Sequence, residues 1–246
     1  MSTDRQSELA ESLELVRAQI RDACAAAGRR PEEVRLLAVT KTFPAVDAAL
    51  LTDLGMTDLA ENRDQEAGAK AAEVAAMRPG SRVRWHMVGR LQRNKARSVV
   101  RWADEVQSVD SIRLADALAK AVRTARERGE RDHPLDVLAQ VSLDDEETAR
   151  ARGGCPLPEL PALAENLTQS GDLRLRGLMA VAPLGADPRE AFSRLAAARE
   201  KFLEDHPSAM ELSAGMSGDL EQAIACGSTC VRVGTALLGR RGLASP

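Results

Sequence analysis

The sequence predicts a (β/α)8 barrel, the TIM-barrel class of α/β fold, with one extra helix at its N-terminus. Short β-like runs alternate with helical stretches along the chain, a pattern typical of parallel sheets. There are eight such runs, which is the strand number of this barrel. No Gly-rich dinucleotide fingerprint follows the first run, which disfavours a Rossmann domain. An open, doubly wound sheet of about six to eight strands is the alternative.

The first element is a helix that the spacing of apolar residues predicts over residues 5–28. Steps of four, three and four residues separate Leu9, Leu13, Val16 and Ile20, which places them on one helical face. Gly28 and Pro31 are stop signals for this helix. We expect residues 1–30 to pack on the barrel as an N-terminal helix.

The eight strands are predicted from apolar runs separated by helical patterns. The runs cover residues 34–40, 57–62, 83–89, 105–111, 136–142, 173–181, 210–215 and 230–238. Helical stretches between them include 63–77, 111–129 and 187–203. The last of these opens with Asp187 as an N-cap and Pro188 at the first helical position. No linker rich in Gly, Pro or Ser divides the chain, so a single domain, 1–246, is expected.

Composition narrows the range of partners. The 34 basic and 37 acidic residues nearly balance, so neither a nucleic-acid nor a membrane partner is expected. The basic stretch 90–101 is better explained as a solvated helix face. No secretory signal and no membrane-length apolar run is present, and the four cysteines form no CxxC pair. These features predict a cytoplasmic protein with free thiols.

Lys41 ends the first predicted strand, within the stretch LLAVTKTFPA (36–45). In a barrel of this class, functional residues sit where strands end and loops begin. Asn62 follows strand two, His86 lies near the end of strand three, and Arg232 lies in strand eight. The fold therefore predicts that these side chains converge on one mouth.

The chemistry of this mouth follows from an amine beside phosphate-binding turns. A lysine at an apolar rim loses solvation, which lowers its pKa, and a neutral amine forms a Schiff base with a carbonyl. Both aldolases and proteins that hold pyridoxal phosphate use such a lysine. Two turns near the end of the chain could bind phosphate through backbone N–H groups. They contain Ser213, Gly215, Ser217 and Gly218, and then Gly234 and Thr235.

A series of motifs resembles the YggS/PROSC family of pyridoxal phosphate homeostasis proteins, whose fold is similar to the barrel domain of alanine racemase. The motifs are AVTKTFP, AENRDQE, WHMVGRLQRNK, QSVDS, LRGLMAV and LSAGMSGDLEQAIACGSTCVRVGTALLG, between residues 34 and 241. Departures from the family pattern are Ala60 in place of Gly, Arg63 in place of an aromatic residue, and the less typical Arg90. These departures affect the expected local packing more than the expected cofactor binding, because they lie beside the central residues of the motifs.

The resemblance implies a cofactor, pyridoxal 5'-phosphate, bound as a covalent aldimine at Lys41. It implies that Asn62 and His86 lie beside the cofactor and that Arg232 faces the pyridine nitrogen. It implies that Ser213 or Ser217, with the amides of Gly234 and Thr235, holds the phosphate. The expected partners are this small molecule and, transiently, apo-enzymes that depend on it, with the chain acting as a monomer or weak dimer.

The composition also bears on catalysis. The resemblance implies that related racemases use a lysine and a tyrosine as two bases, the tyrosine coming from a second, β-rich domain. This chain has no tyrosine and ends at residue 246, which leaves no room for that domain. Arg232 stays protonated and would keep the pyridine nitrogen unprotonated, a poor electron sink. We expect a factor for pyridoxal phosphate homeostasis, storing or delivering the cofactor, rather than an enzyme; the alternative is a single-domain amino-acid racemase.

Overall fold

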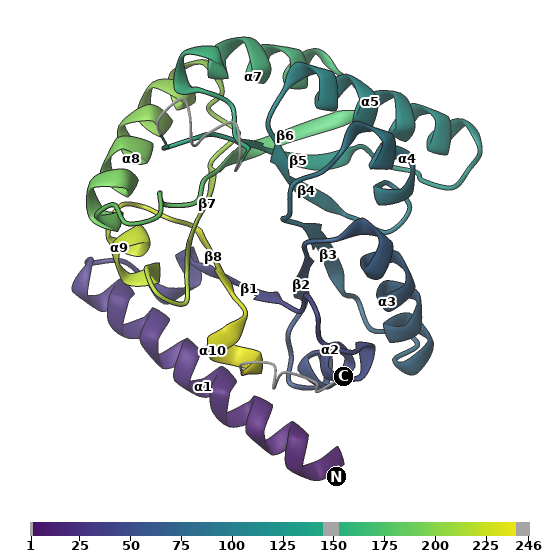
Figure 1. Cartoon of the computed structure of the whole chain (residues 1–246), viewed down its shortest axis with the longest axis vertical. Coiled ribbons are helices and arrows are strands. Elements are labelled where there is room, and N and C mark those ends of the chain that lie inside the picture. The colour runs from purple at the N-terminus through teal and green to yellow at the C-terminus, as the bar shows by residue number, and fades with distance from the viewer. Residues whose placement is uncertain (1, 145–152, 240–246) are drawn as a thin grey trace.

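The computed structural model of the chain describes residues 2–144 and 153–239. Its strands form a closed barrel in which neighbours pair in chain order and in parallel (Figure 1). The prediction of a (β/α)8 barrel is confirmed, and the open sheet is excluded. The strands are β1 (Arg35–Val39), β2 (Asp58–Glu61), β3 (Arg84–Met87), β4 (Glu105–Val109), β5 (Leu135–Gln140), β6 (Leu173–Met179), β7 (Glu211–Met216) and β8 (Cys230–Val233).

Helices surround the barrel (Figure 1). The α-helices are α1 (Ser2–Ala26), α2 (Ala45–Asp53), α3 (Asp64–Met77), α4 (Ala96–Val99), α5 (Ile112–Glu127), α7 (Leu160–Gln169), α8 (Pro188–Asp205), α9 (Leu220–Ala225) and α10 (Thr235–Leu238). Short 3-10 turns cover Pro31–Glu33, Arg93–Lys95 and Leu157–Glu159. As predicted, Asp187 caps α8, because its carboxylate accepts from the backbone N–H of Arg189 at 2.9 Å. No helix in the described part of the chain is long and apolar enough to cross a membrane.

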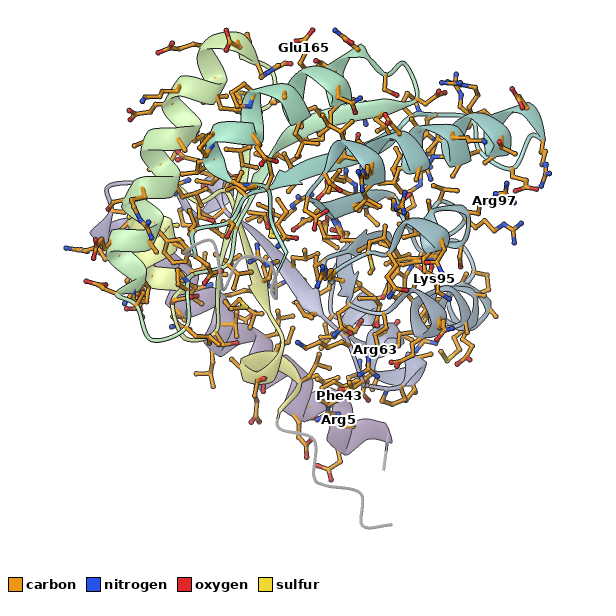
Figure 2. The ribbon with its side chains drawn as sticks, turned by 45° about the horizontal axis from the view of Figure 1, so that its top comes forward. Arg5, Phe43, Arg63, Lys95, Arg97 and Glu165 are labelled. Carbon is orange, nitrogen blue, oxygen red and sulfur yellow. The ribbon has the colours of Figure 1, made fainter. Side chains whose placement is uncertain are left out.

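Helix α1 packs against α2, α9 and α10. Its predicted stripe is buried in a core shared with α2, α9 and α10. Near its N-terminus, Arg5 donates to a carboxylate oxygen of Asp47 at 2.9 Å and to the carbonyl of Leu238 at 3.0 Å. The Arg5 guanidinium also lies 6.0 Å from the ring centre of Phe43, and Figure 2 shows the two side chains together. Helix α1 therefore supports the turn that follows β1.

The barrel interior is polar at one end and apolar in the middle. At the amino ends of the strands lies a group of paired charges that we call the ion belt. Its members are Arg35, Asp58, Arg84, Glu105, Asp136, Arg174, Arg176 and Glu211. Above it, Leu37, Val39, Ala60 and Cys230 form a small apolar cluster. The mouth expected to bind a ligand is at the opposite end, where the strands finish.

Candidate functional site

Lys41 lies in a tight turn directly after β1. The turn is closed by the N–H of Phe43, which donates to the carbonyl of Thr40 at 3.1 Å. Thr42 has a φ of 66°, a left-handed conformation that is strained for a β-branched residue. The Lys41 side chain is exposed, so the protein alone does not desolvate its amine as the sequence had suggested. The turn instead presents the amine to incoming molecules.

A buried ion pair anchors this turn from outside the barrel wall. The Nζ of Lys70, on α3, donates to Oε1 of Glu61 at 2.5 Å and to the Thr40 carbonyl at 2.8 Å. The Thr40 hydroxyl donates to the same Glu61 oxygen at 2.6 Å. All three residues are buried. They join the end of β1 to the end of β2 and to α3, and so fix where Lys41 and Asn62 begin.

Asn62 follows β2 and faces the mouth from the neighbouring strand. Its Oδ1 is buried without a hydrogen-bond partner among the described residues. Gly89, just beyond β3, packs on its backbone, because a Cβ at Gly89 would lie 2.2 Å from the Asn62 carbonyl oxygen. Only glycine fits that contact. The unpartnered amide oxygen is a polar atom for which a ligand could provide a donor.

The residues predicted to bind phosphate lie at the ends of β7 and β8, and Gly215 is within β7 rather than in the turn after it. Gly215 has a φ of 92°, and a Cβ there would lie 2.7 Å from the Cβ of Ala223. This conformation turns the chain into residues 217–219, where Ser217 is partly exposed. On the neighbouring strand, Gly234 precedes α10 and Thr235 begins it. The first N–H groups of a helix have no acceptor within it, so these amides can bind an anion.

Arg232 lies inside the barrel, held at two points. Its Nη1 donates to the hydroxyl of Ser213 at 2.7 Å, and its Nη2 donates to the carbonyl of Ala180 at 2.8 Å. The side chain is only 5% exposed, and burial lowers the pKa of its guanidinium. Ser213 is fully buried within β7 rather than in the turn beyond it, and its hydroxyl donates to Oε1 of Gln107 at 2.7 Å.

His86 points toward the lower half of the barrel. Its Nε2 lies 2.9 Å from Oδ1 of Asp58, and its Nδ1 lies 3.1 Å from Oε1 of Glu105. Both partners are members of the ion belt, and His86 is fully buried. Both ring nitrogens of His86 are therefore engaged by carboxylates away from the mouth.

Mutual attraction between His86 and Glu105 sets the pKa shifts of both side chains. Burial alone would lower the pKa of His86, but its hydrogen bonds to Asp58 and Glu105 raise it above its usual value. Burial would raise the pKa of Glu105, yet the hydrogen bond and charge of His86, with Arg35 and Arg84, lower it to about 2. The carboxylates therefore favour the protonated form of His86, and a protonated His86 favours their ionised form.

A cavity of about 820 Å³ opens beside the mouth, over the ends of β2, β3 and β4. It meets the predicted cofactor residues only at Asn62. Five basic side chains line it: Arg63, Arg90, Arg93, Lys95 and Arg113. Among the residues that the structure describes, Arg93, Lys95 and Arg113 form no ion pair. Figure 2 shows Arg63 and Lys95 on this side of the molecule.

Comparison with known proteins places the chain in a family. Residues 12–242 match the family described as alanine racemase, N-terminal domain. A pyridoxal phosphate homeostasis protein of Mycobacterium leprae is 45% identical, over 99% of this chain and 96% of its own. The protein of the same name from Escherichia coli is 38% identical, over 96% of this chain and 97% of its own.

The chain belongs to the pyridoxal phosphate homeostasis family. Its fold resembles that of PipY of Synechococcus elongatus, solved with PLP bound, at a TM-score of 0.78 and 33% identity, covering 94% of this chain and 100% of PipY. An alanine racemase of Clostridium difficile has the same barrel, at a TM-score of 0.69 and 16% identity, with 97% of this chain and 58% of the racemase covered. The predicted family is confirmed, and its curated relatives are named as homeostasis proteins rather than as enzymes.

Within this member of the family, the predicted residues fall into three groups. Those at the mouth, on turns or strand ends, are Lys41, Asn62, Ser217, Gly234 and Thr235. Arg232 and Ser213 lie inside the barrel, hydrogen-bonded to each other. His86 lies deeper, against the ion belt.

Sequence reasoning missed Gln107 and Glu105, which connect Ser213 to His86 through the interior. The signal was available, because the two polar residues are spaced by two within a buried strand and so share a face.

Proposed function

We propose that this chain binds pyridoxal 5'-phosphate covalently at Lys41 and serves as a cytoplasmic store that delivers it to apo-enzymes, without robust catalysis of its own. One observation carries the proposal. An exposed lysine on a firmly anchored turn lies at the same barrel end as two glycine turns and a buried arginine. Relatives at 38–46% identity carry the name of pyridoxal phosphate homeostasis protein, and PipY was solved with PLP bound.

The residues present suit the chemical groups of this cofactor. The amine of Lys41 would form a Schiff base with the cofactor aldehyde, with loss of one water. Ser217 and the amides of Gly234 and Thr235 would hold the phosphate. Arg232 would face the pyridine nitrogen, for which it can only donate a hydrogen bond. The buried Oδ1 of Asn62 would accept from a donor on the ligand or on an ordered water.

The same geometry favours storage over turnover. Arg232 stays charged, so it leaves the ring nitrogen unprotonated and weakens the electron sink that the bound cofactor supplies. Racemisation also needs a second acid–base group on the opposite face of the substrate. The chain has no tyrosine, and both ring nitrogens of His86 are hydrogen-bonded to carboxylates, those of Asp58 and Glu105. With both ring nitrogens held by these carboxylates, His86 is not placed to accept a proton from a substrate in the mouth.

Reduction with borohydride tests the attachment point. The lysines of the chain are Lys41, Lys70, Lys95, Lys120 and Lys201. We expect one cofactor per chain, fixed on the peptide that contains Lys41. Lys41→Ala should abolish the label and the visible absorption, while Lys95→Ala, which changes a cavity lysine, should retain both. Label on Lys70 or Lys95 in the wild-type protein would contradict the assignment.

The absence of catalysis is tested with the same preparation. L-alanine incubated with the loaded protein in heavy water should keep its α-proton. Rapid exchange with formation of D-alanine, at rates typical of enzymes (~1–10³ s⁻¹), would favour the racemase alternative instead.

A further inference from the structure

A continuous line of hydrogen bonds runs down the barrel interior from Arg232, and we call it the polar column. Arg232 donates to Ser213, Ser213 to Gln107, and the Nε2 of Gln107 to Oε1 of Glu105, each at 2.7 Å. Glu105 then meets His86 at 3.1 Å. The described members are all buried, at 5% exposure or less. A buried series of hydrogen bonds of this kind is stable only if each donor has an acceptor.

The direction of each bond in the column is fixed by its two ends. Arginine can only donate, so the Ser213 oxygen accepts from Arg232 and its single proton must go to Gln107. The amide oxygen of Gln107 therefore faces Ser213, and its NH₂ group faces the carboxylate of Glu105. The opposite amide orientation would set an oxygen against that carboxylate. The column thus has one arrangement that satisfies every group.

The lower end of the column is held rigidly. Glu105 receives Gln107 and His86 on one oxygen and Arg84 on the other, the latter at 2.9 Å. His86 is fixed in turn by Asp58 at 2.9 Å. These contacts belong to the ion belt, which closes the amino end of the barrel. Charge-assisted bonds are stronger than neutral ones, so the column has a firm base.

The upper end decides where the guanidinium of Arg232 points. Its contact with Ala180 is to a backbone carbonyl, so only the contact with Ser213 depends on another side chain. Without that contact, the planar group keeps one tether and can rotate about it. We propose that Ser213 and Gln107 are positioning residues, which aim Arg232 at the ring nitrogen of the bound cofactor, with the Glu105–His86 pair as their anchor.

In this assignment, Ser213 acts on the cofactor ring through Arg232 instead of binding the phosphate. His86 acts through the polar column instead of lying beside the cofactor. The assignment rests on the proposed function, since Arg232 is the group through which the column acts. Among the described residues, the hydrogen bonds of Gln107 and Glu105 all lie within the column and the ion belt. Their effect on the cofactor must therefore pass through Ser213 and Arg232.

The structure provides a matched pair of serines for the test. Ser108, next to Gln107 on β4, is 1% exposed, and its hydroxyl has no partner among the described residues. Ser213→Ala and Ser108→Ala remove the same atom from equally buried sites. Cofactor affinity, the pH titration of the visible band, and thermal melting of the cofactor-free protein are measured for both variants and for wild type.

We expect Ser213→Ala to weaken cofactor binding about tenfold, the equivalent of one lost positioning bond, and to shift the pH at which the visible band titrates. Ser108→Ala should match wild type within about twofold. Gln107→Leu, which leaves every mouth residue in place, should produce the same pH shift as Ser213→Ala. It also keeps the test decisive if Ser213→Ala does not fold.

The outcome against the proposal is specific. If Ser213→Ala and Gln107→Leu lower the melting temperature but keep the affinity and pH profile of Ser108→Ala, the column is only a packing feature. Failure of the proposed function looks different, because then the wild-type protein itself would carry no borohydride-stable label at Lys41.

Discussion

The two halves of the barrel mouth are built in different ways. The closed half comprises the ends of β7, β8 and β1, where Ser213, Arg232 and Thr40 are buried and hydrogen-bonded. The open half comprises the ends of β2, β3 and β4, around the cavity of about 820 Å³. There the basic side chains of Arg93, Lys95 and Arg113 carry no ion pair within the described residues. One half is organised in advance of binding, and the other is solvated.

This difference indicates a division of labour. Groups that are already fixed lose little freedom when a ligand arrives, so the closed half is suited to holding the cofactor. Solvated cations attract an anion over several ångströms without fixing it, so the open half is suited to its arrival and departure. A store needs both properties, and changes on the two halves should therefore have different consequences for stability, affinity and rate.

The largest effect is expected at Gly215, which lies in β7 just before the turn of the closed half. Gly215→Ala would impose a side chain on a φ of 92° and place its Cβ 2.7 Å from Ala223. We expect the free energy of unfolding to fall by about 2–4 kcal/mol, from backbone strain and overpacking. Cofactor affinity should fall with it, as the turn that carries Ser217 shifts. Denaturant titration and cofactor titration measure the two effects.

Gly218, three residues later in the turn that follows β7, is the matched control. A Cβ there meets nothing within 4 Å, so Gly218→Ala should change stability by less than about 0.5 kcal/mol. Equal losses in the two variants would show that the turn tolerates no substitution for a reason other than the one given by the geometry of Gly215.

Much of this architecture could be predicted from the sequence, because it depends on local patterns. The alternation of β-like and helical runs predicted the barrel, and the Asp187–Pro188 pair predicted the start of α8. The run 230–238 was predicted as one strand, but β8 ends at Val233 and α10 covers Thr235–Leu238. A short apolar run has no period that separates strand from helix.

The interior of the site could not be predicted in the same way. Ser213 seemed to belong to a phosphate turn, yet β7 extends to Met216 and buries it. Its partner Gln107 is 106 residues away in the chain. Such a pairing is decided by barrel closure and register, which bring β4 and β7 across the interior. Local sequence shows which residues are polar, but not which of them meet.

A smaller effect is expected from the acid titration of Glu105, at the base of the polar column that supports the closed half. Its pKa is about 2 in the folded protein against 4.5 as the reference value. Its contribution to stability is therefore present above pH 4.5 and lost as pH falls toward 2. The pKa of His86 is raised above 6.5, so its contribution is present below pH 6.5 and lost as pH rises through the folded value. Both stability contributions, that of Glu105 and that of His86, are therefore present between pH 4.5 and 6.5.

Glu105→Gln should flatten the loss of stability of the cofactor-free protein between pH 4.5 and 2. The matched change on the open half is Glu66→Gln, whose carboxylate makes an exposed ion pair with Arg63 at 3.0 Å. Exposed pairs contribute little, so that variant should keep the wild-type pH profile. An unchanged acid limb in Glu105→Gln would mean that other carboxylates of the ion belt dominate the titration.

The smallest effect is expected on the open half, where charge acts on rates. The double variant Arg93→Gln/Lys95→Gln should slow association of the anionic cofactor by about two- to threefold at low salt. The difference should vanish near 0.5 M salt, where screening acts within roughly 4 Å. Dissociation should not change, because these side chains lie over β3 and β4, away from the closed half. Stopped-flow absorbance at several ionic strengths measures both rates.

The control removes the same charge from outside the cavity, as Arg82→Gln/Arg97→Gln. Arg82 precedes β3 at the other end of the barrel, and Figure 2 shows Arg97 at the edge of the molecule. The control variant should slow cofactor association less than the cavity variant does at every salt concentration. The reason is that the electric field of a charge falls with distance and with screening by salt. Faster dissociation in the cavity variant alone would place its side chains in contact with the bound cofactor. The open half would then help to hold the ligand, and the division between the two halves would fail.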